Sequence, residues 1–146
     1  ILKAAKYLKE IDKLNNIAFY CYGDKNSIGS QYFKINNSLI YYGLTDDFFL
    51  NDPLKNVNEI INAVDLVVIP SFYEGCPNVA METVLCNKPI VINKSANNSG
   101  LVVNGKNGII IKNGDYFALS NAIIKLKNEK FNSSYSDKYL KQFHDK

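Results

Sequence analysis

The stretch "VVIPSFYEGCPNVAMETVLCNKPIVIN", residues 67–93, decides the predicted fold. It begins with an apolar run, passes through a turn marked by glycine and prolines, continues as a helix-like segment and ends in a second apolar run. A continuous apolar run is typical of a strand that is buried on both faces. Pro70 has no N–H group to donate to a neighbouring strand, so it predicts the end of the first run as a strand. We therefore expect a strand, a helix and a second strand in this order.

The same alternation extends outward in both directions. The predicted strands are residues 17–23, 38–43, 66–69, 88–93 and 108–112, and the predicted helices are residues 1–12, 57–65, 78–86 and 115–127. Asp115 is placed to cap the last helix, and residues 48–56 are expected to form an irregular loop. Alternating strands and helices with short links predict an α/β fold, a Rossmann-like parallel sheet with flanking helices. The predicted domain is residues 1–130, followed by a C-terminal helix or tail at residues 131–146.

Composition argues against several classes of function. The chain has 146 residues and a net charge of +3, and all of its basic residues are lysines. Arginine usually makes the bidentate contacts to phosphate and guanine, so we expect no nucleic-acid partner. Three cysteines without close pairing predict a reducing, cytoplasmic compartment. With His144 as the single histidine, the sequence predicts no metal site, and no apolar run is long enough to span a membrane.

The turn between the first strand and the helix of this stretch holds the candidate functional residues. Gly75 permits a backbone conformation that other residues resist, and Pro77 suits the first position of a helix. The helix is therefore expected to begin near residues 76–78, where free N–H groups attract phosphate or another anion. Glu74 stands before this start and Glu82 lies within the helix. A carboxylate can accept hydrogen bonds from two vicinal hydroxyls, which predicts a sugar or ribose ligand.

Each of these residues also has a plainer interpretation. Glu74 would complement the helix dipole, and Glu82 would be a solvated helix residue. Tyr73 either stacks on a ligand ring or packs on its own loop. Residues 97–99 either meet phosphate oxygens or are ordinary turn residues. Spacing alone leaves these alternatives open.

The segment "PSFYEGCPNVAMETVLCNKPIV", residues 70–91, resembles the donor-binding segment of the group 1 glycosyltransferases (family 4, GT-B fold). The matching residues are Pro70, Ser71, Glu74, Gly75, Pro77, Glu82 and Pro89. Residues 102–126 and the two upstream runs that end in glycine are similar to the family in the same order. The resemblance extends to about residue 127. It implies the C-terminal, nucleotide-sugar-binding domain of a GT-B enzyme, lacking its first strand, which would precede Ile1.

The resemblance implies a metal-independent enzyme without a cofactor. It would transfer a hexose, with retention, from a nucleotide-diphosphate sugar donor to an acceptor in polysaccharide, lipopolysaccharide or glycolipid synthesis. Glu74 would be the catalytic residue, in contact with the hexose near the reacting carbon, and Glu82 would bind the ribose hydroxyls. The residues whose backbone would hold the sugar hydroxyls and the diphosphate are Gly75, Cys76, Pro77 and Asn78. The residues expected to line the nucleotide pocket are Gly23, Gly43 and Leu44.

The sequence departs from the family in several places. The arginine and lysine that usually clamp the diphosphate would lie on the loop after the first strand, and neither is present in this chain. Asn87 stands where the family usually has glycine, and Gly100 stands where it usually has glutamate. The acceptor domain, which is N-terminal in the family, is also missing, so we expect this chain alone to be inactive.

Two rival hypotheses remain open from the sequence. The first is a nucleotide-sugar epimerase of the same fold, which should carry a catalytic histidine in its cleft. The second is a degenerate domain that only binds nucleotide or mediates assembly. A lipid-linked acceptor, and with it a peripheral position at the inner face of the membrane, is a further alternative to a purely cytoplasmic protein.

Overall fold

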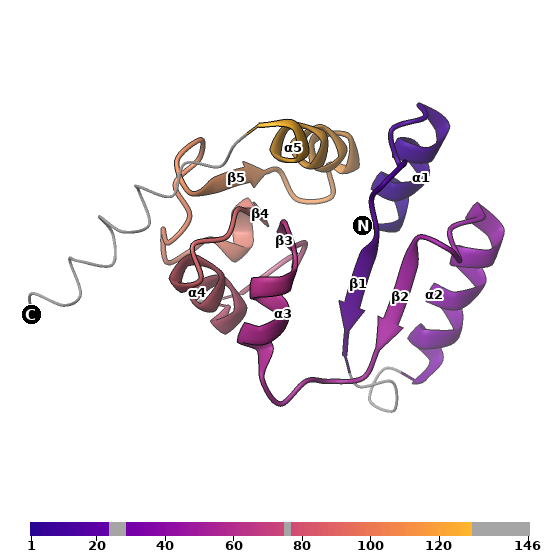
Figure 1. Cartoon of the computed structure of the whole chain (residues 1–146), viewed down its shortest axis with the longest axis horizontal. Coiled ribbons are helices and arrows are strands. Elements are labelled where there is room, and N and C mark those ends of the chain that lie inside the picture. Colours follow the sequence, from indigo (N-terminus) through magenta and orange to yellow (C-terminus); the bar gives the residue numbers. More distant parts are fainter. Residues whose placement is uncertain (24–28, 75–76, 130–146) are drawn as a thin grey trace, which may run out of the picture. The chain divides into compact units, whose positions relative to one another are not determined.

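The structure is a computed structural model that describes residues 1–23, 29–74 and 77–129. Its elements confirm the predicted α/β fold with parallel sheets and flanking helices (Figure 1). The chain divides into two compact units, Ile1–Lys55 and Asn56–Lys146. The predicted C-terminal helix or tail lies outside the described residues, and so do the candidate site residues Gly75 and Cys76.

The described residues of the first unit form two helices and a two-stranded parallel sheet. Its elements are α1 (Leu2–Glu10), β1 (Phe19–Tyr22), α2 (Gly29–Tyr42) and β2 (Phe48–Asn51). Aromatic side chains align across the two strands, because Phe19 lies opposite Phe48 and Tyr20 lies opposite Phe49. The ring centroids of these pairs are 4.5 Å and 5.0 Å apart, on opposite faces of the sheet. Stacked pairs of this kind add to the hydrogen bonds of the ladder and fix its register.

The predicted strand at residues 38–43 is wrong, because this segment is the end of helix α2. Gly43 takes the left-handed conformation, with a φ of 63°, directly after the helix. The N–H of Gly43 donates to Ile40, and the N–H of Leu44 donates to Leu39. These two bonds form a Schellman motif, in which a buried residue after the glycine packs back on the last turn. Leu44 is that residue, and it is fully buried.

The irregular loop predicted at residues 48–56 is also wrong in its first half, which is strand β2. Phe48 is buried and Leu50 is half-buried, whereas Phe49 is 42% exposed. This alternation is the period of a strand with one covered face. The second strand of the first unit therefore ends at Asn51, and its end is not Gly43.

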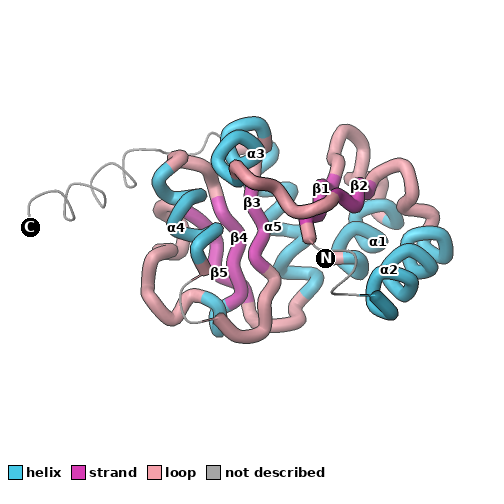
Figure 2. The backbone as a smooth tube through the Cα atoms, turned by 90° about the horizontal axis from the view of Figure 1, so that it is seen from below, coloured by secondary structure: helices cyan, strands magenta, loops and turns pink. Residues whose placement is uncertain are grey.

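The second unit has three layers. Its elements are α3 (Val57–Ala63), β3 (Val67–Ile69), α4 (Asn78–Leu85), β4 (Ile90–Asn93), a 3-10 turn η1 (Lys94–Ala96), β5 (Gly108–Ile111) and α5 (Tyr116–Asn128). The sheet is parallel in the order β3-β4-β5. Figures 1 and 2 show the strands side by side, and Figure 1 shows α3 and α4 on one side of this sheet with α5 on the other. This arrangement follows from right-handed crossovers between parallel strands.

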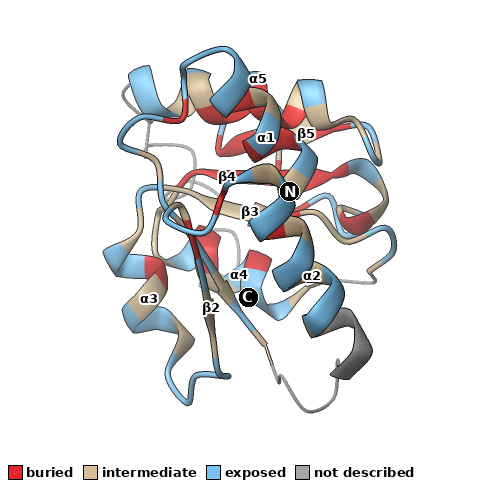
Figure 3. Ribbon diagram, turned by 90° about the vertical axis from the view of Figure 1, so that its right-hand side faces the viewer, coloured by how far each residue is buried: buried red, intermediate tan, exposed pale blue. Residues whose placement is uncertain are grey.

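The core of the second unit centres on β4, in which all four residues are buried (Figure 3). A buried hydrophobic cluster combines residues of the strands, of α4, of η1 and of the loop before β5. Its members are Ile69, Ala80, Val84, Ile90, Ile92, Ala96, Leu101 and Val102. The prediction that the apolar runs of residues 66–69 and 88–93 form buried strands is therefore confirmed for the central strand. In β3, which is an edge strand, Ile69 is buried and Val67 and Val68 are half-buried.

The predicted cap of α5 is confirmed. The Asp115 carboxylate accepts a hydrogen bond of 2.8 Å from the N–H of Ala118. Free N–H groups at a helix start need such an acceptor, and a carboxylate also complements the helix dipole. We expect Asp115→Ala to lower the free energy of unfolding by about 1 kcal/mol, measured by urea denaturation. An unchanged midpoint would contradict the importance of this cap.

Gly108 begins β5 at a point where the sheet leaves no room for a side chain. A Cβ atom there would lie 2.4 Å from the Ile90 carbonyl oxygen and 2.8 Å from a Val102 methyl group. We therefore expect Gly108→Ala to lower the free energy of unfolding by about 1–3 kcal/mol, because overpacking forces the backbone to shift. Gly23→Ala is the matched control, since its added methyl group would meet no described atom within 4 Å. Equal melting temperatures for both variants would contradict the close approach at Gly108.

Candidate functional site

The loop after β3, residues Pro70–Glu74, lies at the carboxyl edge of the second unit's sheet. Strand β3 ends at Ile69, directly before the proline, as predicted. Strands β4 and β5 run parallel to β3, so the segments that follow Asn93 and Ile111 emerge at the same edge. Ligands of open α/β sheets bind outside the carboxyl ends of the strands. This loop and its neighbours are therefore the place to look for a binding site.

The base of the loop is fixed by a buried amide. Asn93, the last residue of β4, is only 3% exposed. Its Nδ2 donates to the carbonyl oxygens of Pro70 at 2.7 Å and of Ser71 at 3.1 Å. A buried amide that donates to two carbonyls with no other partner among the described residues stabilises the loop, because leaving such groups without partners is costly.

The middle of the loop is held by a second pair of side chains. Ser95 Oγ, from η1, donates to the Phe72 carbonyl oxygen. Asn113 Nδ2, from the turn after β5, donates to the same carbonyl at 3.2 Å and to Ser95 Oγ. The Asn113 Oδ1 atom in turn accepts from the N–H of Ser95 at 3.3 Å. The three segments that leave the sheet edge are thus tied together at Phe72.

The tip of the loop is held by Asn98. Its Nδ2 donates to the Glu74 carbonyl oxygen at 2.8 Å and to the Ser95 carbonyl at 3.0 Å. The neighbouring Asn97 instead bonds both the N–H and the carbonyl of Val102, at 2.9 Å and 2.8 Å. Asn97 is therefore a turn residue, one of the two alternatives open from the sequence, whereas Asn98 reaches across to the candidate catalytic residue.

Helix α4 begins just beyond the loop. It starts at Asn78, inside the predicted range, but Pro77 is its N-cap residue and not its first helical residue. Pro77 has an extended ψ of 124°, and its carbonyl accepts from the N–H groups of Ala80 and Met81. No described atom accepts from the N–H groups of Asn78 and Val79, and no described side chain caps the helix. Two free donors and the positive end of the helix dipole suit an anion.

The two glutamates lie on either side of this helix start. Glu82 is four residues after Asn78, so both residues share one face of α4. Glu74 and Glu82 are half-buried, and among the described residues neither carboxylate has an ion-pair partner. The opposite face of α4 packs into the core through Ala80 and Val84. The free carboxylates are therefore available to accept hydrogen bonds from a ligand.

Two aromatic residues of the loop remain in solvent. Phe72 is 70% exposed and Tyr73 is 81% exposed. The alternative that Tyr73 packs on its own loop is thus not what the structure shows. Because the carbonyls of the loop are bonded on both sides of Tyr73, at Phe72 and Glu74, the backbone below these rings is fixed.

The structure accommodates both departures from the family pattern. Asn87 has a φ of 56° and ends α4 in a Schellman motif, because its N–H donates to Val84 and the next N–H, of Lys88, donates to Thr83. Asparagine and glycine are the residues that tolerate this conformation best, so asparagine can replace glycine here. Gly100 has a φ of 68°, which disfavours glutamate at this position.

The remaining candidates lie in the first unit. The N–H of Gly23 donates to the Asn51 carbonyl at 3.2 Å, so this glycine does follow the carboxyl end of a strand, as predicted. The family resemblance also predicts Gly43 and Leu44 in the nucleotide pocket, but these two residues do not follow a strand. They terminate helix α2, where the Gly43 carbonyl accepts from Lys9 Nζ and Leu44 is fully buried.

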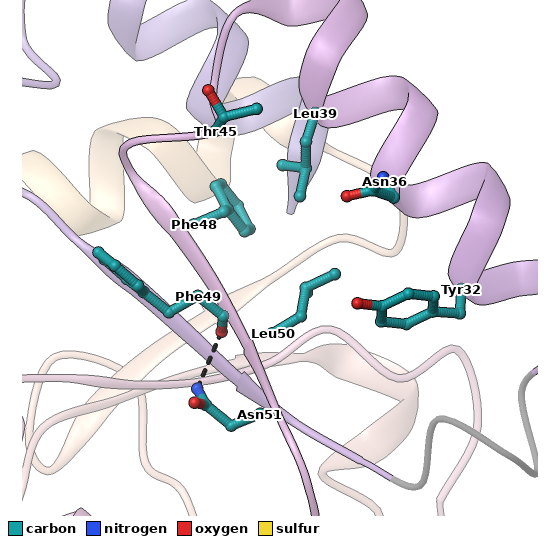
Figure 4. A pocket seen from close by; sticks show the side chains of 8 residues that line it. All are labelled: Tyr32, Asn36, Leu39, Thr45, Phe48, Phe49, Leu50 and Asn51. Carbon is teal, nitrogen blue, oxygen red and sulfur yellow. Dashed lines mark hydrogen bonds between the residues drawn. The ribbon is translucent and has the colours of Figure 1, made fainter.

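The first unit also contains a pocket of about 300 Å³ between α2 and β2 (Figure 4). Its lining residues are Tyr32, Asn36, Leu39, Thr45, Phe48, Phe49, Leu50 and Asn51. None of these side chains is charged, and none is a predicted site residue. The candidate site therefore rests on the sheet edge of the second unit and not on this pocket.

The sequence also led to predictions about metal sites, membrane-spanning segments and cysteines. The described residues contain no group of three or more His, Cys, Asp or Glu side chains that could hold a metal ion. No described helix is both long and apolar enough to cross a membrane. Cys21 and Cys86 are free thiols, and burial raises the pKa of the Cys21 thiol, which keeps it protonated at neutral pH.

Sequence reasoning missed the residues that hold the loop. Asn93, Ser95, Asn98 and Asn113 are the side chains in question. One signal was present, because a polar residue at the end of a fully apolar strand must find a buried partner. The partner itself could not be identified, since Asn93 and Pro70 are 23 positions apart in the sequence.

Comparison with known proteins places these features in a family. Residues 1–129 match the family described as "Glycosyl transferases group 1". An Escherichia coli relative, UDP-Gal:α-D-GlcNAc-diphosphoundecaprenol α-1,3-galactosyltransferase, is 24% identical over 128 residues, which cover 88% of this chain and 32% of that protein. The Staphylococcus aureus capsular polysaccharide biosynthesis glycosyltransferase CapM is 32% identical over 79 residues, 52% of this chain and 21% of that protein. This chain thus spans a third or less of these relatives.

A solved structure shares the fold. It is that of a mutant of S. aureus TarM in complex with fondaparinux, α-GlcNAc-glycerol and UDP. Its TM-score is 0.76 at 23% identity, and the match covers 97% of this chain and 31% of TarM. At this identity the likeness concerns the arrangement of helices and strands.

The Asn93 amide can be tested by its contribution to stability. We expect Asn93→Ala to lower the free energy of unfolding by about 2–3 kcal/mol, because the variant leaves two carbonyls of the loop without a partner. Asn121→Ala, on the exposed side of α5, is the matched control and should change it by less than about 0.5 kcal/mol. Urea denaturation measures both variants. Equal stabilities would show that the amide does not fix the loop.

Proposed function

The chain belongs to the group 1 glycosyl transferases, and on that premise we propose that it is the donor-binding domain of a retaining, nucleotide-sugar-dependent hexosyltransferase. The observation that carries the proposal is the uncapped start of α4, flanked by Glu74 and Glu82. An anion site between two carboxylates suits a ligand that has a diphosphate in the middle and hydroxyl groups at both ends. A nucleotide-diphosphate sugar has this distribution of groups.

The diphosphate of the donor would lie at the start of α4. The free N–H groups of Asn78 and Val79 would donate to phosphate oxygens, and the helix dipole would add attraction. The same donors would stabilise the charge that builds up on the diphosphate as the sugar departs, which lowers the barrier to transfer. Gly75 and Cys76 would contribute their own N–H groups to this site.

The glutamates would bind the two hydroxyl-bearing ends of the donor. Glu82, one helical turn beyond Asn78, would accept hydrogen bonds from the ribose hydroxyls. Glu74 would accept from the hexose near its reacting carbon and stabilise the positive charge that develops there. The two acids are thus separate contacts to one ligand and not a pair that shares a proton.

We propose a uridine nucleotide as the donor and a surface polysaccharide or glycolipid precursor as the product. The E. coli relative uses UDP-galactose, as its name states, and TarM was solved with UDP. The acceptor, the cationic groups that clamp the diphosphate, and a peripheral position at the membrane would depend on parts of the protein outside this chain. Transfer without a metal ion is part of the proposal, because the helix start provides the stabilisation of charge.

The rival hypotheses gain no specific support. Asn87 and Gly100 both have a left-handed backbone conformation, which asparagine and glycine tolerate best, so each departure suits the local fold. The described residues contain no histidine that could serve an epimerase. Gly23, at the carboxyl end of β1, stays a candidate for the nucleotide pocket.

The nucleotide site is tested by titrating the full-length protein with UDP, GDP and ADP. We expect UDP to bind most tightly and Glu82→Ala to weaken it by about 10–100-fold, because two hydrogen bonds to a charged group are lost. Glu129→Ala is the matched control, since this glutamate lies at the end of α5 and is exposed. Absence of binding by the wild type, or unchanged binding by Glu82→Ala, would refute the assignment.

The sugar site is tested separately with Glu74→Gln. This variant should bind UDP within about twofold of the wild type but transfer sugar at least about 100-fold more slowly, as found when one stabilising group is removed from a charged transition state. The rate of UDP release from the full-length protein measures transfer. A variant with normal transfer would exclude a catalytic role for Glu74.

A further inference from the structure

We propose that Asn98 is the positioning residue that holds Glu74 in place for the donor sugar. The inference rests on the proposed function, because it concerns the same site. It begins with the bond from Asn98 Nδ2 to the Glu74 carbonyl oxygen, which is 2.8 Å long and joins residues 24 positions apart. No motif of the sequence marks this contact.

The peptide groups on both sides of Tyr73 and Glu74 are bonded. The carbonyl of Phe72, before them, accepts from Ser95 Oγ and from Asn113 Nδ2. The carbonyl of Glu74, after them, accepts from Asn98. Because the Cα atom of Glu74 lies between these two fixed peptide groups, its side chain starts from a defined position. Side chains that react must be held to within about 0.5 Å, and a misplacement of about 1 Å can cost 100-fold in rate.

The bonds at the two ends of the loop differ in their surroundings. Asn93, at the base, is buried, and its loss is expected to destabilise the fold. Asn98, at the tip, is exposed, and its side chain makes a second bond, to the Ser95 carbonyl at 3.0 Å. A hydrogen bond in an exposed position contributes little to global stability. The main effect of the bond from Asn98 is therefore to fix the position of Glu74.

The contact also connects a segment that matches the family motif, at Glu74, with a segment in which this chain departs from it. Asn98 belongs to residues 96–101, "ANNSGL", whose loop turns at Gly100. The bond from the Asn98 amide therefore makes the position of Glu74, which would touch the hexose, depend on the position of this loop. The ribose contact at Glu82 lies on α4 and has no bond to Asn98. A change at Asn98 should consequently affect the sugar end of the donor and spare the nucleotide end.

This separation provides a readout that a general loss of structure would not give. The full-length wild type, Asn98→Ala and the control Asn121→Ala are titrated with UDP, and with UDP-galactose and UDP-N-acetylglucosamine. The comparison uses the UDP-sugar that the wild type binds more tightly. We expect Asn98→Ala to weaken its binding by about five- to tenfold, as for the loss of one hydrogen bond, and to leave UDP within about twofold. Asn121→Ala should change neither.

The conservative variant Asn98→Gln tests the amide itself, because it keeps the donor group on a longer side chain. It should bind the UDP-sugar more tightly than Asn98→Ala. The proposal is overturned if Asn98→Ala binds the UDP-sugar as well as the wild type, if UDP and UDP-sugar weaken by the same factor, or if Asn98→Gln is as weak as Asn98→Ala. A collapse of the melting temperature in Asn98→Ala would overturn it too, since the residue would then be structural.

Failure of the proposed function has a different signature. A wild type that binds neither UDP nor a UDP-sugar would refute the donor site as a whole, and this inference with it. A wild type that binds both ligands, combined with an Asn98→Ala variant that binds them equally well, would refute only the role of Asn98.

Discussion

The buried amide of Asn93 is the contact on which the candidate site depends. It ends the central strand of the second unit and turns two carbonyls of the loop after β3 toward the sheet edge. Without this anchor, the loop would have to leave polar backbone groups unpaired beside an apolar core. Further side-chain bonds to the carbonyls of Phe72 and Glu74 hold the rest of the loop, from its buried base to its exposed tip. The core of the sheet and the geometry of the site are therefore parts of one arrangement.

The start of α4 can bind an anion because its first N–H groups have no cap. The N-cap residue Pro77 has no side-chain acceptor, and no described side chain caps α4, so the N–H groups of Asn78 and Val79 stay available. In helix α5, by contrast, the Asp115 carboxylate accepts a hydrogen bond from the N–H of Ala118. The two helices of one unit thus differ, because a side chain caps the start of α5 and no described side chain caps the start of α4. The half-buried glutamates beside α4 add acceptors to these donors.

The ends of helices α2 and α4 explain why the strand predicted at residues 38–43 is wrong, and they also explain the roles of Gly43 and Asn87. Gly43 and Asn87 take the same left-handed conformation after α2 and α4, and each is followed by the second bond of a Schellman motif. In α2 the run "SLIYYG" is rich in residues that favour strands, and this local preference suggested the wrong element. The helical signal was nevertheless present, because Ile35, Leu39 and Tyr42 recur at intervals of four and three residues. Packing of the buried Leu39 and Leu44 overrode the local propensity.

The sequence by itself determined the α/β class, the two strands around the Gly- and Pro-marked turn, the cap of α5 and the family of the chain. These features depend on local patterns, such as apolar runs, helix starts and an ordered motif, that are readable within a few neighbouring residues. Tertiary structure alone decided that residues 38–43 are helical, that β2 ends at Asn51, and that Asn98 reaches Glu74. These facts arise from contacts between segments far apart in the sequence, and an asparagine in a loop gives no sign of which distant carbonyl it will bind.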